Sequence, residues 1–219
     1  KLMTKITPKK VLNYALSRLG VKSIQRKYPR HTASPNENRH VLNGMVAYNE
    51  YGGYFMPISS KQRPAVQKIL NGKVYEPKTI SYMRANCNNG DIIHAGTFFG
   101  DFLPGISSAL SKKAQIWAFE PNPENFRCAK ITCMINQLNN INLINAGLGD
   151  VSTKSHMIVK SSTGVNLGGE SYVTDKSNEG EVVKIDIVKI DETVPSERQI
   201  SILQLAIKAA MQIGVQAKK

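Results

Sequence analysis

Two glycines and a glutamate have the spacing that says most about the chemistry of this chain. Gly96 and Gly100 follow the apolar run "DIIHA", and Glu120 ends the next apolar run, "QIWAFE", twenty residues after Gly100. At a strand-to-helix turn, glycines let a ligand approach the backbone N–H groups, because a Cβ there would occupy the ligand's space. A carboxylate at this spacing reaches the two hydroxyls of a ribose. The residues predict a site for an adenosine-containing ligand; the alternative is a turn that needs no ligand, with Glu120 beginning a helix cap.

The elements that position these residues alternate between strand and helix from residue 91 onward, which is typical of a mostly parallel α/β sheet covered on both faces. Four core strands are predicted over "DIIHAG", "QIWAFE", "INLINAGLG" and "ISILQLAI". Two more strands, "SHMIVK" and "EVVKIDIVKI", are expected to form a hairpin across "STGVNLGGE". Helices are predicted over "DFLPGISSALSKK" and "ENFRCAKITCMINQLN". In the second, Asn122 is the expected N-cap, and the expected inner face is Phe126, Ala129, Cys133 and Met134.

The segment before the sheet is polar and irregular. Residues 1–88 are predicted to form an N-terminal extension or cap, packed over or beside the domain formed by residues 89–219. Short helices are expected over "PKKVLNYALSRLG" and over "RPAVQKILNG", where Pro64 lies in the first turn and Gly72 at the end. Gly52 and Gly53 are expected to form a hinge or turn.

The composition limits the class of protein. The chain has 219 residues, 41% of them hydrophobic, which is enough for one sizeable core. A net charge of +13 suggests an acidic partner such as nucleic acid, but the Lys and Arg residues are spread along the chain, which favours an ordinary solvated surface. Three cysteines without metal spacing predict a reduced, cytoplasmic protein. No apolar run has the length of a membrane span, and no His, Asp and Glu cluster has ligand spacing, so we expect no membrane span and no metal.

Three successive segments resemble one family in order and spacing. "GDIIHAGTFFGDFLP", "WAFEPNPENF" and "NQLNNINLINAGLGD" are similar to the FkbM family of S-adenosylmethionine-dependent methyltransferases, and "FEPNPENF" is the most specific of these matches. The resemblance runs from about Asn49 to Gln204 and includes the N-terminal extension of a branch of that family. It implies a Rossmann-like class I methyltransferase sheet, S-adenosylmethionine as cofactor, and O-methylation of a hydroxyl on a sugar, glycan or small metabolite. A nicotinamide dehydrogenase is disfavoured, because the glycine spacing is not Gly-x-Gly-x-x-Gly.

The resemblance also implies roles for single residues, beginning with those that would surround the cofactor. Gly96, Thr97, Phe98 and Gly100 would line its methionine and ribose side, Glu120 would bind the ribose hydroxyls, Pro121 and Asn122 would border the adenine, and Asn145 and Ala146 would flank it from the other side. Asp101 would hold the turn or the cofactor's amino group. For Asn145, a strand-ending side chain bonded to its own backbone is an equal alternative. His94 is the candidate base for the acceptor's hydroxyl proton, although a histidine that bonds the cofactor or a loop is favoured.

The chain departs from the family pattern after its last core strand. Where the family has Asp-Val-Glu-Gly, this chain has "AIKA", with Ala206 and Lys208 at the acidic positions, and Met211 replaces a further acidic residue. The resemblance implies a seven-stranded sheet, so four core strands predict a sheet incomplete on its C-terminal side, and a second copy could cover the open edge of "ISILQLAI". A catalytically impaired relative is therefore the first alternative. An RNA-binding or RNA-modifying protein is the second, although neither an Asn-Pro-Pro-aromatic motif nor interleaved aromatic and basic residues favour it.

Overall fold

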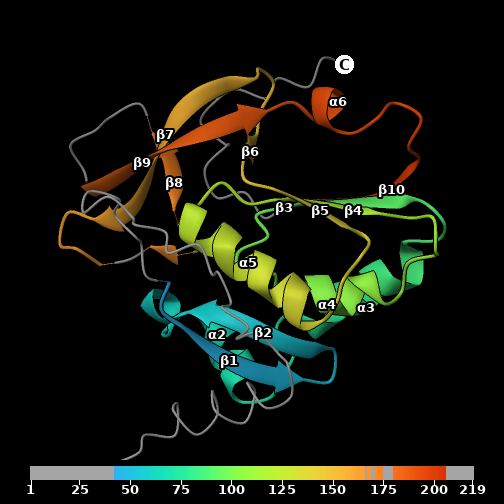
Figure 1. The fold of residues 1–219 in the computed structure, drawn as a ribbon, viewed down its shortest axis with the longest axis horizontal. Coiled ribbons are helices and arrows are strands. Elements are labelled where there is room, and N and C mark those ends of the chain that lie inside the picture. The colour runs from blue at the N-terminus through green and yellow to red at the C-terminus, as the bar shows by residue number, and fades with distance from the viewer. Residues whose placement is uncertain (1–41, 166, 169–170, 175–179, 206–219) are drawn as a thin grey trace, which may run out of the picture. The chain divides into compact units, whose positions relative to one another are not determined.

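The computed structural model describes residues 42–165, 167–168, 171–174 and 180–205 (Figure 1). All of these residues belong to one unit of the chain. The helix expected over "PKKVLNYALSRLG" and the replaced acidic positions Ala206, Lys208 and Met211 lie outside the described residues.

A four-stranded parallel sheet carries the segments predicted as core strands. β3 (Asp91–Ala95), β4 (Ile116–Phe119), β5 (Ile141–Ile144) and β10 (Ile200–Leu205) pair in the order β10-β3-β4-β5. Every pairing between these strands is parallel. All five residues of β3 are buried, as expected for an apolar strand covered on both faces of a parallel sheet. The prediction of a mostly parallel, Rossmann-like α/β sheet is therefore confirmed.

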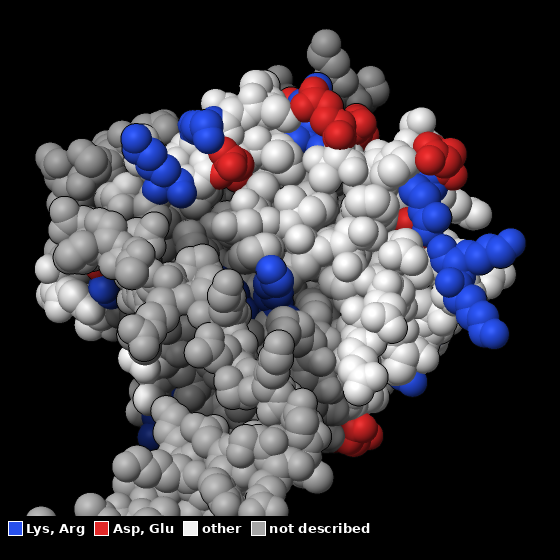
Figure 2. Space-filling view, viewed as in Figure 1, with Lys and Arg blue, Asp and Glu red and all other residues white. Residues whose placement is uncertain are grey.

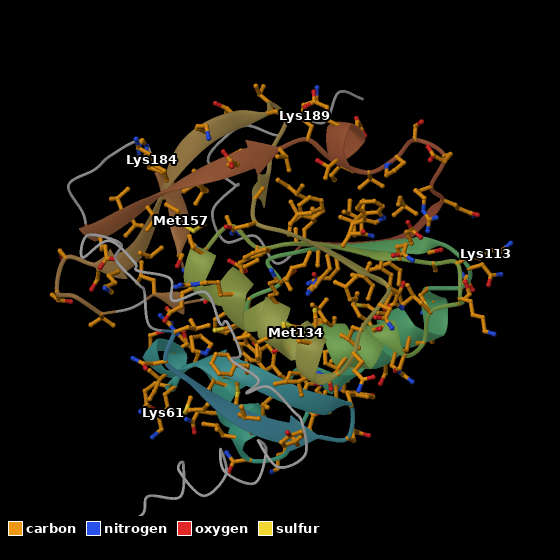
Figure 3. The ribbon with its side chains drawn as sticks, in the orientation of Figure 1. Lys61, Lys113, Met134, Met157, Lys184 and Lys189 are labelled. Carbon is orange, nitrogen blue, oxygen red and sulfur yellow. The ribbon has the colours of Figure 1, made fainter. Side chains whose placement is uncertain are left out.

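Two helices connect the parallel strands. α4 (Leu103–Ser107) is much shorter than the predicted helix, whereas α5 (Pro123–Ile135) begins where it was expected. The Asn122 side-chain oxygen accepts the N–H of Glu124 at 2.9 Å, which confirms the predicted N-cap. The expected inner face of α5 is wrong in part, because Met134 is 67% exposed while Thr132 is fully buried (Figure 3).

The inner face of α5 includes polar residues because these satisfy the edge of another strand. β1 (Gly44–Asn49) and β2 (Gly52–Pro57) form an antiparallel hairpin, with Gly52 and Gly53 at the start of β2. Thr132 Oγ1 accepts the Phe55 N–H at 3.0 Å, and the Asn136 amide bonds both backbone groups of Gly53, at 2.9 and 2.6 Å. The hydrogen-bonding edge of β2 is thus held by side chains of the helix.

Two helices and a 3₁₀ turn follow the hairpin. These are η1 (Ile58–Ser60), α2 (Pro64–Leu70) and α3 (Pro77–Asn86). α2 confirms the helix predicted over "RPAVQKILNG", with Pro64 in the first turn, and Gly72 after it has a left-handed φ of 68°. Val66 and Ile69 of α2 are fully buried in a cluster with Tyr54 of β2 and Phe99. This cluster attaches the described part of the N-terminal segment to the turn after β3.

A second sheet stands at the carboxyl ends of the parallel strands. β6 (Gly147–Leu148), β7 (Thr153–Ser161), β8 (Tyr172–Thr174) and β9 (Gly180–Val188) pair in the order β6-β9-β7-β8, and α6 (Ile190–Thr193) leads back to β10. β7 and β9 are antiparallel, as the sequence predicts, but β8 adds a partner on the other edge of β7. Met157, Val159 and Ile185 form the buried apolar face of this sheet.

Gly100→Ala is expected to destabilise the protein more than Gly164→Ala. Both glycines have left-handed backbones, with φ of 83° and 79°, so alanine costs about 1–2 kcal/mol of strain at either position. A Cβ at Gly100 would also lie 3.3 Å from Leu103 Cδ1 and 3.4 Å from Thr132 Cγ2, whereas Gly164 has nothing within 4 Å. Urea unfolding should show an additional loss of about 1 kcal/mol for Gly100→Ala. Equal losses for the two variants would contradict packing against α5.

Candidate functional site

A cavity of about 510 Å³ lies at the carboxyl ends of the parallel strands. His94, Ala95 and Gly96 at the end of β3, Phe119 and Glu120 at the end of β4, Ala146 after β5, and Gln204 and Leu205 at the end of β10 line it. The strand order runs from β3 through β4 to β5 in one direction, and β10 lies on the other side of β3. Open α/β sheets bind ligands in the crevice at such a topological switch point. The cavity has the position and size of a small-molecule site.

The rest of the cavity wall comes from the second sheet and from the N-terminal segment. Leu148, Met157, Val173 and Ile187 give one apolar wall, and Met157 on β7 is labelled in Figure 3. Arg63, Pro64, Ala65, Tyr75 and Glu76, which precede or begin α2 and α3, form another wall. The segment predicted as a cap therefore takes part in the cavity.

The turn between β3 and α4 has an unusual backbone. Gly96, Phe98 and Gly100 all have left-handed φ values, of 81°, 54° and 83°. Gly96 and Thr97 donate their N–H groups to the Phe119 carbonyl at 2.9 and 3.1 Å, and Gly100 donates to the Thr97 carbonyl at 2.8 Å. Phe98 donates its N–H to Glu120 Oε2 at 2.7 Å. These four donors are satisfied within the protein, so they do not form a cradle for a phosphate.

Glu120 holds this turn from the end of β4. Its side chain accepts the Phe98 N–H on one oxygen and the Asn122 N–H on the other, at 2.7 and 2.8 Å, and the residue is only 5% exposed. Burial raises the pKa of Glu120 to about 7, although the two backbone hydrogen bonds oppose the shift. The Asn125 side chain donates a third hydrogen bond to Glu120, and because a carboxylate has roughly four acceptor sites, a ligand hydroxyl can still donate to it.

Asp101 is a second buried carboxyl on the same cavity wall. Its residue is 8% exposed, and its side chain accepts hydrogen bonds from its own N–H and from that of Phe102. Burial is the main cause that raises the pKa of Asp101 to about 7, and the nearby carboxyls of Glu76 and Glu120 add to it. The pKa values of Asp101 and Glu120 therefore both lie near neutral pH.

His94 faces Gln204 across the pairing of β3 with β10. Its Nδ1 bonds the Gln204 amide oxygen, and its ring stacks on Phe102 with 5.3 Å between the ring centroids. Burial lowers the pKa of His94 to about 4, which keeps the imidazole neutral at pH 7. Nε2 is buried and has no partner among the described residues. An imidazole of this pKa is a poor base at neutral pH, and the ring nitrogen without a proton can accept a hydrogen bond.

The sequence-predicted residues divide between the cavity wall and the layer that supports it. His94, Gly96, Phe98, Asp101, Glu120, Pro121 and Ala146 line the cavity, whereas Thr97, Gly100, Asn122 and Asn145 are absent from its wall. Thr97 Oγ1 donates to the His94 carbonyl at 3.2 Å. Asn145 Nδ2 donates to the carbonyls of Glu120 and Pro121 at 2.7 and 3.2 Å, and so ties the end of β4 to that of β5.

Sequence reasoning missed several residues of the cavity wall. Asn125, Arg63, Tyr75, Glu76 and Gln204 were not among the candidates, yet all of them line it. Gln204 had a usable signal, because a polar residue in an apolar strand at the height of His94 must face either the crevice or a partner. Arg63 and Glu76 gave no such signal, since their approach depends on how the N-terminal segment packs.

The described ranges contain no group of three or more His, Cys, Asp or Glu side chains able to hold a metal ion. Among the same residues, no helix is long and apolar enough to cross a membrane. Cys87, Cys128 and Cys133 are free thiols.

Comparisons with known proteins give weak and partial likenesses. No family model and no curated protein matches the chain. A SAM-dependent methyltransferase from Aquifex aeolicus is similar at 18% identity and a TM-score of 0.30, over 33% of this chain and 39% of that one. The tRNA m1G37 methyltransferase of M. jannaschii is similar at 13% identity and a TM-score of 0.31, over 65% and 53%. A complex of aTrm5 and tRNALeu is similar at 12% identity and a TM-score of 0.34, over 50% and 33%. This chain spans 33% to 53% of the length of these structures, and its function is inferred from the geometry of its site.

Proposed function

We propose that this chain binds S-adenosylmethionine in the cavity and acts as an O-methyltransferase of the FkbM type, with a hydroxyl of a sugar, glycan or small metabolite as acceptor. The observation that supports this most is the place of the cavity, at the switch point of a parallel sheet, with the Gly96 turn on one side and Glu120 at the end of the next strand. The resemblance in "FEPNPENF" supports the same family. Residues 1–88 would be the cap and 89–219 the cofactor-binding domain.

The polar groups of the cavity fit this cofactor better than a phosphate-bearing nucleotide. Asn125 Oδ1 and His94 Nε2 are buried acceptors without a partner among the described residues, and both residues line the cavity. Glu76, Asp101 and Glu120 also line the cavity. S-adenosylmethionine brings hydroxyl, amino and ammonium donors, and when bound it supplies a methyl group on a positively charged sulfur. A pyrophosphate would meet carboxyls, and the four turn N–H groups are already satisfied.

In this proposal the chain's own residues bind and orient, and they exclude water. Glu120 holds the turn and accepts ribose hydroxyls, while Pro121 and Ala146 flank the base with apolar surface. Methyl transfer to a hydroxyl needs an in-line approach more than covalent help, and the apolar wall of Met157, Val173 and Ile187 keeps that approach dry. His94 would accept a hydrogen bond and would not store a proton.

Calorimetric titration of the full chain with S-adenosylmethionine tests the proposal. Saturable binding that excess ATP or NAD does not displace is the expected result, because both competitors bring phosphates to a carboxyl-lined wall. An acceptor screen with cofactor carrying a labelled methyl group would then follow. No binding, or displacement by ATP, would remove the assignment. Binding without transfer to any acceptor would favour the catalytically impaired relative, which the "AIKA" segment suggests.

The net charge of +13 favours an RNA partner as the alternative to a small-molecule or glycan acceptor. Residues 1–41 are rich in Lys and Arg and contain a single acidic residue, Glu37. On the described surface the basic side chains are dispersed and several lie beside acidic ones (Figure 2). Lys61, Lys113 and Lys184 lie far from one another in Figure 3 and form no platform. Binding of generic RNA that weakens strongly with added salt would favour an RNA partner.

We also propose a reducing, cytoplasmic location and a self-association surface. The free thiols Cys87 and Cys128 are buried, which suits a compartment where thiols stay reduced. β10 is an edge of the described parallel sheet, and Leu203 and Leu205 on it are 53% and 49% exposed. A second copy that covers this edge would remove a site of uncontrolled pairing.

A further inference from the structure

The cavity wall holds two buried carboxyls that form no ion pair with any of the described residues. Asp101 and Glu120 are 8% and 5% exposed. None of the ion pairs found among the described residues involves either of them. Their hydrogen bonds come chiefly from backbone N–H groups, those of Phe98 and Asn122 for Glu120 and those of Asp101 and Phe102 for Asp101. A buried carboxylate without a cation is costly, so such a group either keeps its proton or awaits a positive charge.

The described groups around these carboxyls form no ion pair with them. The titratable and charged side chains that face them or share their cavity are Glu76, Tyr75, Tyr54, Arg63 and His94. The charge of Glu76 raises the pKa of Asp101, and the two tyrosines have raised pKa values chiefly through their own burial. His94 is neutral at pH 7. Arg63 lines the cavity, and no ion pair between it and either carboxyl is found among the described residues.

A second, independent observation indicates the same kind of ligand. His94 and Asn125 are 2% and 1% exposed, line the cavity, and each has a polar atom without a partner among the described residues. Gln204 presents its amide oxygen to His94 Nδ1, which assigns the ring proton to Nδ1 and leaves Nε2 as an acceptor. Asn125 Oδ1 is also an acceptor. The unsatisfied atoms therefore lack donors, which a cation rich in N–H and O–H groups would bring.

We propose that the cavity selects its ligand by positive charge, and that Asp101 and Glu120 release protons as a cationic ligand enters. The positive charge of the ligand takes the place of the proton as the counter-charge of the carboxyls. This inference rests on the proposed function, where the cation is S-adenosylmethionine and a neutral adenosine thioether is the poorer ligand.

The linkage between proton release and ligand binding fixes the sign of the pH dependence of ligand affinity. The pKa values of both carboxyls are about 7 in the free protein, and a bound cation lowers them, because it stabilises the charged form. Affinity for the cation therefore rises with pH and levels off above the free-state pKa. One carboxyl that releases its proton completely gives roughly a tenfold gain in affinity between about pH 6 and about pH 7.5. A neutral ligand gives no such gain.

Calorimetric titration with S-adenosylmethionine and with 5′-methylthioadenosine compares the pH dependence of affinity for a cationic ligand with that for a neutral one. 5′-methylthioadenosine keeps the adenosine and the sulfur but has no positive charge. We expect a gain of roughly tenfold in affinity for S-adenosylmethionine over this pH range and no change for the thioether. Titrations at one pH in two buffers of different ionisation enthalpy count the released protons directly. Release of about one proton or more with the cation, and none with the thioether, is expected.

Variants identify the carboxyls and separate this inference from the proposed function. In Asp101→Asn and Glu120→Gln the proton release should fall, while Glu181→Gln, which removes an exposed carboxylate on β9, should leave it unchanged. Circular dichroism checks that each variant is folded. Binding of S-adenosylmethionine without proton release, or equal pH dependence for both ligands, would overturn the charge selection and leave the cofactor assignment intact. No binding of either ligand would remove both.

Discussion

Asp91→Ala is expected to destabilise the protein by about 3 kcal/mol, which is among the largest losses that one substitution outside the cavity should cause. The Asp91 side chain is 2% exposed and accepts four hydrogen bonds. Gln115 donates its backbone N–H at 2.9 Å, Trp117 its indole N–H at 2.7 Å, and Arg198 donates from Nε at 2.7 Å and from a terminal nitrogen at 2.5 Å. Alanine would leave all of these donors without their acceptor. Arg198 is 29% exposed and regains some hydration, which keeps the loss at the lower end of the range for buried pairs.

Urea unfolding of Asp91→Ala beside Asp186→Ala measures this effect. Asp186 pairs with Lys154 at 3.0 Å on the surface, where both side chains are more than half exposed, so its loss should cost less than about 1 kcal/mol. Burial raises the pKa of Asp91, but hydrogen bonds from Arg198, Trp117 and Gln115 outweigh it and hold the pKa below its usual range. The contribution of Asp91 to stability is therefore present above about pH 4 and is lost as the pH falls further. Similar losses for both variants would contradict this account.

Glu120→Ala is expected to cost about 2–4 kcal/mol and to abolish ligand binding. Alanine leaves the N–H groups of Phe98 and Asn122 buried without an acceptor, and it frees the left-handed turn at Phe98 that forms one wall of the cavity. Glu120→Gln keeps one acceptor oxygen and should cost clearly less. Chemical unfolding gives the difference between the two variants, and titration with S-adenosylmethionine gives the loss of binding. Equal stability of Glu120→Ala and the unchanged protein would show that Glu120 does not hold the turn.

The raised pKa of the Glu120 carboxyl also predicts how the stability of the protein depends on pH. Because the folded pKa of Glu120 is about 7, above the usual value near 4.3, protonation favours the folded state. This contribution is fully present below about pH 4 and is lost as the pH rises through about 7. Stability measured without ligand should therefore fall less over this interval in Glu120→Gln than in the unchanged protein. An unaltered pH profile in the variant would contradict the burial of this carboxyl.

The sequence was informative where one local rule decided the structure. The cap at Asn122, the helix that begins at Pro64 and the buried strand "DIIHA" each follow from residues within a few positions. The inner face of α5 was assigned wrongly because Thr132 is buried to bind a strand of the N-terminal hairpin, which hydrophobic periodicity does not register. α4 ends at Ser107, six residues before the end of the predicted helix, and the apolar periodicity used to predict it did not mark that end.

For the candidate site, the sequence indicated the strand ends but not how their polar groups are used. Gly96, Glu120 and Ala146 all line the cavity, as carboxyl ends of neighbouring parallel strands must lie together. That Glu120 accepts two backbone N–H groups could not be foreseen, because it depends on the left-handed backbone of Phe98, and a phenylalanine rarely adopts that conformation. The approach of Arg63 depends equally on tertiary packing.

The place of β10 in the sheet also bears on how the protein folds. β10 supplies Gln204 and Leu205 to the cavity, yet it pairs with β3, and His94 and Gln204 are 110 positions apart in the chain. Closing so long a loop costs chain entropy before any contact repays it, whereas β3, β4 and β5 are neighbours in sequence and can associate early. During synthesis, β10 is also the last of these strands to leave the ribosome. Among the described strands of the parallel sheet, β10 is therefore expected to pair last, and its residues Gln204 and Leu205 are expected to join the cavity wall after β3, β4 and β5 have associated.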